Sequence, residues 1–172
     1  MELQNAISSR RAIRSYKNTP VEDEKLDQIL KAGCAAPVGR NLYDHLRITV
    51  VQNQELLHRI SEGLKANMHV DFDPIYQAPV LILISSKKMP YPNIEFADAG
   101  CIMQNMMLEA TEQGLGSVVI WGSSMVVNAV PNLKKALQIP DDHTAVAGIV
   151  TGYAKDAVEA KELTLSIHVD RV

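Results

Sequence analysis

Residues 94–113 constrain the fold more than any other part of this sequence, because their helical pattern carries apolar side chains almost all the way round. A helix without a polar face has to be covered on most sides. We therefore predict a long, buried central helix, and we expect Cys34 and Cys101 to be buried apolar residues. The apolar positions of the segment are Phe96, Ala97, Ala99, Cys101, Ile102, Met103, Met106, Met107, Leu108 and Ala110.

Four short apolar runs alternate with helical patterns along the rest of the chain. The run 80–84 is continuous, which predicts a strand covered on both faces. The order ααβαβαβαβ with short connections predicts one α+β or α/β domain over residues 1–172 and leaves the strand directions open. The expected strands are 46–51, 80–84, 117–121 and 145–150. Besides the central helix, we expect a helix from Leu3 into the basic run that ends at Arg14, a second after Thr19, and two more over 56–64 and 133–137.

The residues Thr19-Pro20-Val21-Glu22 have the pattern of a helix N-terminus. Thr19 can accept the amide proton of the third helical residue, Glu22 can reach back to the amide of Thr19, and proline suits the first helical position. We therefore expect Thr19 to cap the second helix.

The composition excludes several classes of protein. The 172 residues are 47% hydrophobic and 22% charged, which is typical of a globular domain rather than a disordered chain. A net charge of -3 lacks the basic surplus of a nucleic-acid-binding protein. Neither a signal peptide nor a run of about 18 apolar residues is present, so we expect a cytoplasmic protein without a membrane span. The cysteines and histidines show no metal-binding spacing.

Three arginines near the N-terminus form the most distinctive charged cluster. If the first helix continues, Arg10 and Arg14 share one face and Arg11 lies three residues from Arg14, so their guanidinium groups can clamp one phosphate. Alternatively, they only complement the partial negative charge at a helix C-terminus, which contributes about 0.3–1 kcal/mol for each. The phosphate-loop, nucleophile-elbow and HExxH signatures are absent.

Four segments, taken in order, resemble the FMN-dependent nitroreductase family. The resemblance spans residues 3–153, nearly the whole chain, and it implies a three-layer α/β/α fold with a central, mostly antiparallel sheet. It also implies a homodimer with FMN at the subunit interface. The segments are Arg10-Arg11-Ala12-Ile13-Arg14-Ser15-Tyr16, Ala36-Pro37-Val38-Gly39-Arg40-Asn41, Asp98 to Leu108 continuing into Gly114-Leu115-Gly116-Ser117 and Ile120-Trp121-Gly122, and Gly152-Tyr153.

The resemblance implies a set of residues that bind FMN. In the family, the first segment holds the phosphate and ribityl chain, the second lines the cofactor, and backbone amides of the third lie along the isoalloxazine ring. No side-chain acid or base is required. The corresponding positions here are Arg10, Arg11, Ala12 and Arg14; Pro37, Val38, Gly39 and Asn41; Val119, Ile120, Trp121 and Gly122; and Lys161 as the C-terminal cation near the phosphate.

The chain departs from the family pattern at several of these positions. Ala12 and Val38 stand where the family usually has serine, which removes two hydrogen bonds worth roughly 0.5–1.5 kcal/mol each. The family's Gln-Pro-Trp is replaced by residues 43–45, and Trp121 is bulkier than the usual small or acidic residue. We therefore expect a narrower substrate pocket.

The implied reaction is a ping-pong transfer. NADH or NADPH reduces the flavin and leaves, and an acceptor of quinone, nitroaromatic or enone type then takes the electrons from the same face. Residues 154–172 are expected to exchange with the partner subunit, with 163–169 adding a strand to it. Two other readings stay open: an FMN-binding module with little nicotinamide-dependent turnover, and a small interaction protein whose arginines only cap a helix.

Overall fold

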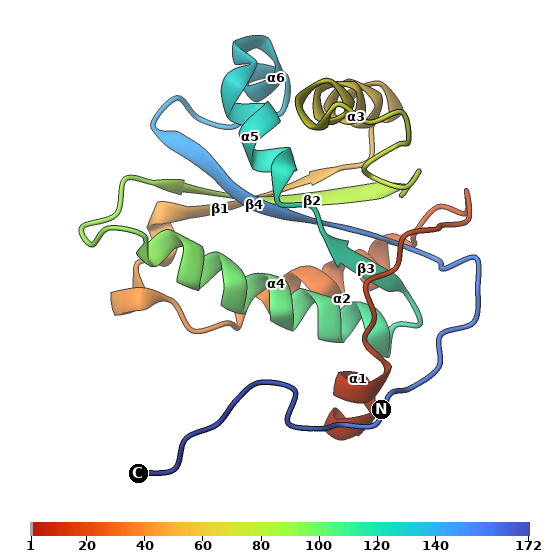
Figure 1. Cartoon of the computed structure of the whole chain (residues 1–172). Helices are drawn as coiled ribbons and strands as arrows, with labels where there is room; N and C mark the ends of the chain where they lie inside the picture. The colour runs from red at the N-terminus through yellow and green to blue at the C-terminus, as the bar shows by residue number, and fades with distance from the viewer. Residues whose placement is uncertain (1) are drawn as a thin grey trace.

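A four-stranded sheet lies between two layers of helices (Figure 1). The computed structural model describes residues 2–172. The strands are β1 (Leu46–Val51), β2 (Val80–Lys87), β3 (Gly116–Val119) and β4 (His143–Gly152). The α-helices are α1 (Leu3–Ser9), α2 (Asp23–Cys34), α3 (Gln54–Met68), α4 (Ile94–Glu112), α5 (Gly122–Ala129) and α6 (Pro131–Ala136), and the 3-10 helices η1 and η2 cover Gly39–Asn41 and Tyr43–His45.

The strand order is β1-β2-β4-β3, and each neighbouring pair is antiparallel. The predicted α+β fold with its antiparallel central sheet is therefore confirmed. β2 lies inside the sheet, and its side chains alternate between two cores: Leu81 and Leu83 pack on one side, and Ile82 and Ile84 on the other. The continuous apolar run thus forms a strand covered on both faces, as predicted.

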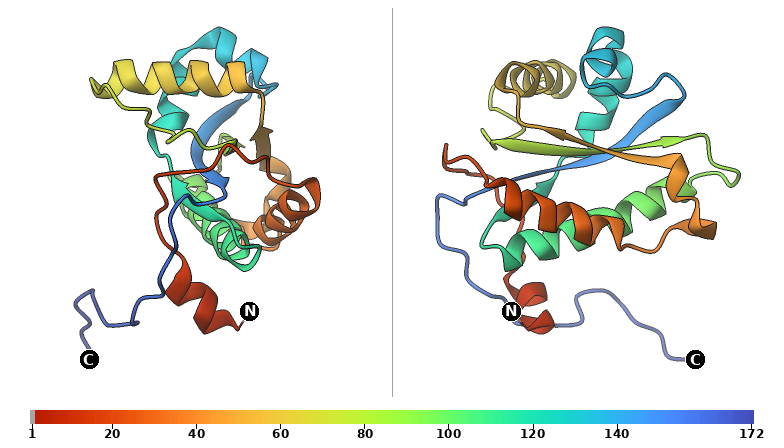
Figure 2. Two further views of the ribbon diagram at one scale, coloured as in Figure 1. Left: turned by 90° about the vertical axis from the view of Figure 1, so that its right-hand side faces the viewer. Right: turned by 180° about the vertical axis from the view of Figure 1, so that it is seen from behind.

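Helices α3, α5 and α6 cover one face of the sheet, and α2 and α4 cover the other (Figure 1 and Figure 2). In the single chain, the expectation that α4 is buried almost all round is wrong, because one side of the helix faces solvent. Cys34, at the end of α2, is also exposed. We call the exposed side the α4 stripe; it consists of Ala97, Gly100, Cys101 and Gln104.

The predicted continuation of the first helix into the arginines is wrong. α1 ends at Ser9, and Arg10 is already extended, with φ -60° and ψ 120°. The chain that follows pairs with β3 instead of continuing as a helix. The predicted strand 117–121 is too long, because β3 ends at Val119 and α5, which we did not anticipate, begins at Gly122.

The predicted N-cap of the second helix is also wrong. α2 begins at Asp23, four residues after Thr19, and Glu22 occupies the N-cap position without a side-chain cap. The carboxylate of Glu22 instead accepts a hydrogen bond from the Tyr153 hydroxyl at 2.7 Å. The ammonium of Lys25 donates to the same hydroxyl at 2.8 Å. This tertiary contact ties α2 to the end of β4, and it competes with the local capping box for the Glu22 side chain.

The C-terminal segment after β4 runs past α1 and then leaves the three layers (Figure 2). The amide of Lys161 donates to the carbonyl of Ser8 at 3.0 Å as the two segments pass. Beyond that point the apolar side chains find no core, and Leu165 and Ile167 are 79% and 80% exposed. Among residues 2–172, the helices are all too short or too polar to span a lipid bilayer.

Candidate functional site

The arginine-bearing segment after α1 lies along the edge of the sheet. Ala12 forms a parallel β-bridge with Ser117 of β3, and the amide of Ile13 donates to the Ser117 carbonyl at 3.1 Å. A Cβ on Gly116 would lie 2.5 Å from Cγ1 of Ile13, so glycine at this position permits the close approach. Tyr16 anchors the segment from the other end, since its buried hydroxyl donates to the Ile13 carbonyl at 2.9 Å. Burial raises the pKa of that hydroxyl well above its usual range.

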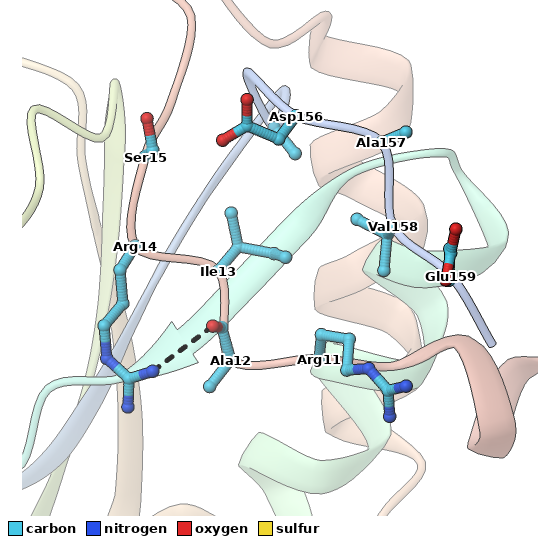
Figure 3. A pocket seen from close by; sticks show the side chains of 10 residues that line it. Arg11, Ala12, Ile13, Arg14, Ser15, Asp156, Ala157, Val158 and Glu159 are labelled. Carbon is cyan, nitrogen blue, oxygen red and sulfur yellow. Dashed lines mark hydrogen bonds between the residues drawn. The ribbon is translucent and has the colours of Figure 1, made fainter. Parts of the chain in front are cut away.

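The extended conformation separates the three arginines. Successive side chains of an extended chain alternate, so Arg10 and Arg14 share one side with Ala12, whereas Arg11 points to the other. Figure 3 shows Arg14 and Arg11 at opposite ends of the segment. The predicted clamp on a single helical face is therefore wrong. Nevertheless, none of the three guanidinium groups forms an ion pair with a carboxylate of residues 2–172.

A hollow of about 500 Å³ lies between this segment and the C-terminal segment (Figure 3). Its lining joins residues 11–15 to residues 154–159. Asp156 and Glu159 contribute two carboxylates to it, and a phosphate placed among them would be repelled. Arg14 lines this hollow as well, so we expect an anion to bind where Arg10 and Arg14 can both reach it, away from the two carboxylates.

The end of β3 presents free backbone amides beside an aromatic pair. Val119 and Trp121 are exposed, whereas Ile120 is buried. The indole of Trp121 packs against the ring of Phe96 with centroids 5.6 Å apart. Among residues 2–172, the amides of Trp121 and Gly122 have no hydrogen-bond acceptor. Because α5 begins here, these amides carry the partial positive charge of a helix N-terminus.

The second predicted segment forms a loop after α2 that includes η1. Pro37 and Asn41 are exposed, and Val38 is buried. The amide of Gly39 donates to Oδ1 of Asp98 at 2.9 Å, which fastens the loop to the N-terminal half of α4.

Within one chain, this loop lies far from the arginines. The loop contacts α4 near its start, whereas the Ala12–Ser117 pair lies just past its C-terminal end (Figure 1). The 19 residues of α4 correspond to a length of about 28 Å. The chain therefore keeps the two predicted halves of the site apart. Lys161, by contrast, lies close to the first half, since its backbone contacts Ser8, two residues before Arg10.

A protein-family model described as the nitroreductase family matches residues 7–153. The chain belongs to the nitroreductase family. The family resemblance predicted from the motifs is thus confirmed.

Relatives and solved structures of the nitroreductase family cover nearly the whole chain. A protein of Archaeoglobus fulgidus, provisionally named an NADH dehydrogenase/NAD(P)H nitroreductase, is 28% identical over 96% of this chain and 93% of its own. The Bacillus subtilis protein named FMN reductase (NAD(P)H) is 28% identical over 90% of this chain and 67% of its own. A solved FMN-dependent nitroreductase of Clostridium difficile is 25% identical, with a TM-score of 0.81 and 99% of each chain covered.

Asp98 of this nitroreductase-family chain begins the third motif segment and contacts the predicted site, although it is not among the residues expected to bind FMN. Asp98 is 4% exposed, and it interrupts the apolar pattern of α4 between Ala97 and Ala99. A charged residue on the buried side of a helix is uncommon unless it is paired, so its position in the helical pattern was the available signal.

Proposed function

We infer that this chain is an FMN-dependent oxidoreductase that takes its electrons from NADH or NADPH. The observation that carries this conclusion is the nitroreductase match over residues 7–153. It is supported by relatives whose names state the same chemistry, an FMN reductase using NAD(P)H and an NADPH-flavin oxidoreductase of Vibrio harveyi.

The residues beside β3 suit the two ends of FMN. A phosphate monoester needs cationic donors, and Arg10 and Arg14 offer unpaired guanidinium groups on the same side of an extended segment. The flavin ring needs donors along its polar edge, and the amides of Trp121 and Gly122 are free to donate. We assign Lys161 as a further cation near the phosphate, and Ala12 and Val119 as contacts along the cofactor.

Bound FMN would accept a hydride from the nicotinamide and pass the electrons to an acceptor. The chain's own residues then have binding and positioning roles rather than acid–base roles. Fixed backbone dipoles at the start of α5 favour negative charge nearby without any reorganisation. Ile120 is buried in the core, so it anchors the backbone of the neighbouring Trp121 and Gly122.

We propose a ping-pong reaction in which donor and acceptor use one pocket in turn. The exposed indole of Trp121 borders that pocket, and its contact with Phe96 limits how far it can swing away. The acceptor is accordingly a small, flat oxidant of quinone, nitroaromatic or enone type.

We also propose that two chains are needed to complete each site. The loop at residues 37–41 and the segment at residues 10–14 lie at opposite ends of α4 within one chain. Two α4 helices that cross through their exposed stripes would bring the loop of one chain to the arginines of the other. The small side chains of Ala97 and Gly100 in the α4 stripe permit the close approach of the helices.

The C-terminal segment supports the same assembly. Residues 163–169 alternate apolar and polar side chains, which is the pattern of a strand with one covered face. β1 is an edge strand with one neighbour, β2, so its other edge is available for pairing within the described residues. We propose that the segment of one subunit pairs with β1 of the other.

Titration of the purified full-length protein with FMN, followed by anaerobic addition of NADH or NADPH, tests the function. The expected result is saturable flavin binding and bleaching of the flavin absorbance by one or both nucleotides. Flavin that binds but stays oxidised with both would favour the alternative of an FMN-holding module. A chain that takes up no FMN would contradict the proposed function altogether and favour an interaction protein.

A further inference from the structure

The carboxylate of Asp98 is buried with half of its hydrogen-bonding capacity unused. Its Oδ1 accepts from the Gly39 amide at 2.9 Å. Its Oδ2 is buried and has no hydrogen-bond partner among residues 2–172. Burying a carboxylate costs free energy unless hydrogen-bond donors compensate for its lost hydration. Asp98 is therefore not explained by the packing of α2 on α4, which an apolar side chain would stabilise better. Its contact with the loop offers a different reason for its presence.

The loop that Asp98 holds has an unfavourable backbone conformation. Arg40 and Asn41 are both left-handed, with φ values of 55° and 59°. Such angles are uncommon for residues other than glycine, and they persist only where surrounding contacts enforce them. Gly39 lies tightly against α4, since a Cβ there would be 2.3 Å from Cδ1 of Ile94.

The loop makes two other side-chain hydrogen bonds, one exposed and one partly buried. The guanidinium of Arg40 donates to the Tyr91 hydroxyl at 2.7 Å, and both side chains are exposed. Tyr43, which is 46% exposed, donates to the Ala36 carbonyl at 3.0 Å. Water competes with the exposed Arg40 bond, whereas the bonds of Tyr43 and Asp98 are partly buried, and of these two only the bond to Asp98 holds a backbone amide of η1.

We propose that Asp98 is a positioning residue for cofactor binding. Its Oδ1 fixes the backbone of Gly39 and thereby holds the loop that meets the flavin, including extended Val38 and left-handed Asn41. This inference rests on the proposed function. What the loop needs is a buried acceptor at Oδ1, so asparagine, which keeps a carbonyl oxygen there, is expected to replace Asp98 and alanine is not.

The test measures FMN affinity and loop order separately in full-length protein. We expect Asp98→Ala to raise the Kd for FMN by at least ~10-fold, which is the effect of losing one charge-assisted hydrogen bond. Hydrogen–deuterium exchange of the flavin-free protein should show faster exchange at Gly39 to Asn41. Asp98→Asn should stay within ~3-fold of wild type, a difference of less than about 1 kcal/mol. If Asp98→Ala does not fold, Asp98→Leu fills the site with an apolar side chain and removes the acceptor.

Asn105 supplies a matched control. It lies two helical turns after Asp98 on the same side of α4, and its Nδ2 donates to the Ala32 carbonyl at 3.1 Å without touching the loop. Asn105→Ala should lower the melting temperature and leave the Kd for FMN unchanged.

The outcomes separate this inference from the proposed function. Wild-type affinity in Asp98→Ala or Asp98→Leu, or a loss in Asn105→Ala as large as in Asp98→Ala, would overturn the positioning role and leave the function standing. A loss in Asp98→Asn as severe as in Asp98→Ala would also overturn it. If the wild-type chain binds no FMN at all, the proposed function fails and the inference fails with it.

Discussion

Ala12 and Ser117 lie side by side in a parallel β-bridge, although they are separated by more than half of the chain. This pairing keeps the arginine segment extended and turns Arg10 and Arg14 to one side and Arg11 to the other. The bridge therefore decides which guanidinium groups can reach the same anion, and it makes Arg11 a natural control for the other two.

Replacing Arg10 or Arg14 with alanine should weaken FMN binding strongly. A charge-assisted hydrogen bond to phosphate contributes about 1.5–3 kcal/mol, so each variant should lose roughly 10- to 100-fold in affinity by calorimetry. Arg11→Ala, made on the opposite side of the segment, should lose much less. Equal losses for Arg11→Ala and Arg14→Ala would show that the alternation is not what organises the phosphate site.

Trp121→Ala should widen the substrate pocket without releasing FMN. The proposed flavin contacts at this position are backbone amides, which alanine keeps, and the indole is 52% exposed, so little packing is lost. We expect kcat/KM for bulky quinones to rise relative to small ones, with the Kd for FMN nearly unchanged. Phe96→Ala is the companion variant, because it removes the support of the indole. Loss of FMN from Trp121→Ala would contradict the backbone assignment.

Tyr153→Phe should be less stable than wild type at neutral pH, and this difference should disappear in acid. The hydrogen bond from Tyr153 lowers the pKa of the Glu22 carboxylate below its usual value of 4.5, with Lys25 contributing in the same direction. A carboxyl group whose pKa is lower in the folded state stabilises above the unfolded pKa, and this contribution is lost as the pH falls through the folded pKa.

The melting temperatures of wild type and Tyr153→Phe should accordingly differ by a constant amount well above the ordinary carboxyl pKa and converge as the pH falls through the lowered pKa of Glu22. Glu22→Gln provides the control, because it removes the titrating group. A gap between wild type and Tyr153→Phe that does not change with pH would rule out Glu22 as the partner that matters.

Changing the apolar residues of the C-terminal segment should dissociate the proposed dimer. Leu165 and Ile167 have little contact within their own chain, so Leu165→Ser with Ile167→Ser should leave the monomer fold intact and remove the side chains that would face the partner. Sedimentation should show a dimer for wild type and a monomer for this variant. The pair Thr164→Ala and Ser166→Ala, on the opposite face, should remain dimeric. A wild-type chain that sediments as a monomer would overturn the assembly.

Much of the fold can be predicted from local patterns, because a strand that is buried on both faces has a continuous run of apolar residues. The run 80–84 predicts a doubly covered strand, and the structure confirms it. The resemblance to the nitroreductase family implies the three layers and the antiparallel sheet, which the local patterns leave open.

The remaining differences arise from long-range contacts. The basic run after α1 has the spacing of a helix, and pairing with β3 more than 100 residues later draws it into an extended conformation. Glu22 has the position of a residue in a local capping box, but its carboxylate accepts a hydrogen bond from Tyr153 instead. Ala97, Gly100 and Cys101 in the α4 stripe are apolar although they are exposed in one chain, which is explained if a second chain covers them as proposed.

The separation of the Gly39 loop from the arginines along α4 has a consequence for how activity depends on concentration. If each active site includes the loop at residues 37–41 of the partner chain, only the dimer turns over substrate, and the specific activity depends on protein concentration. Dilution below the dissociation constant of the dimer would then abolish activity while every individual polypeptide stays folded.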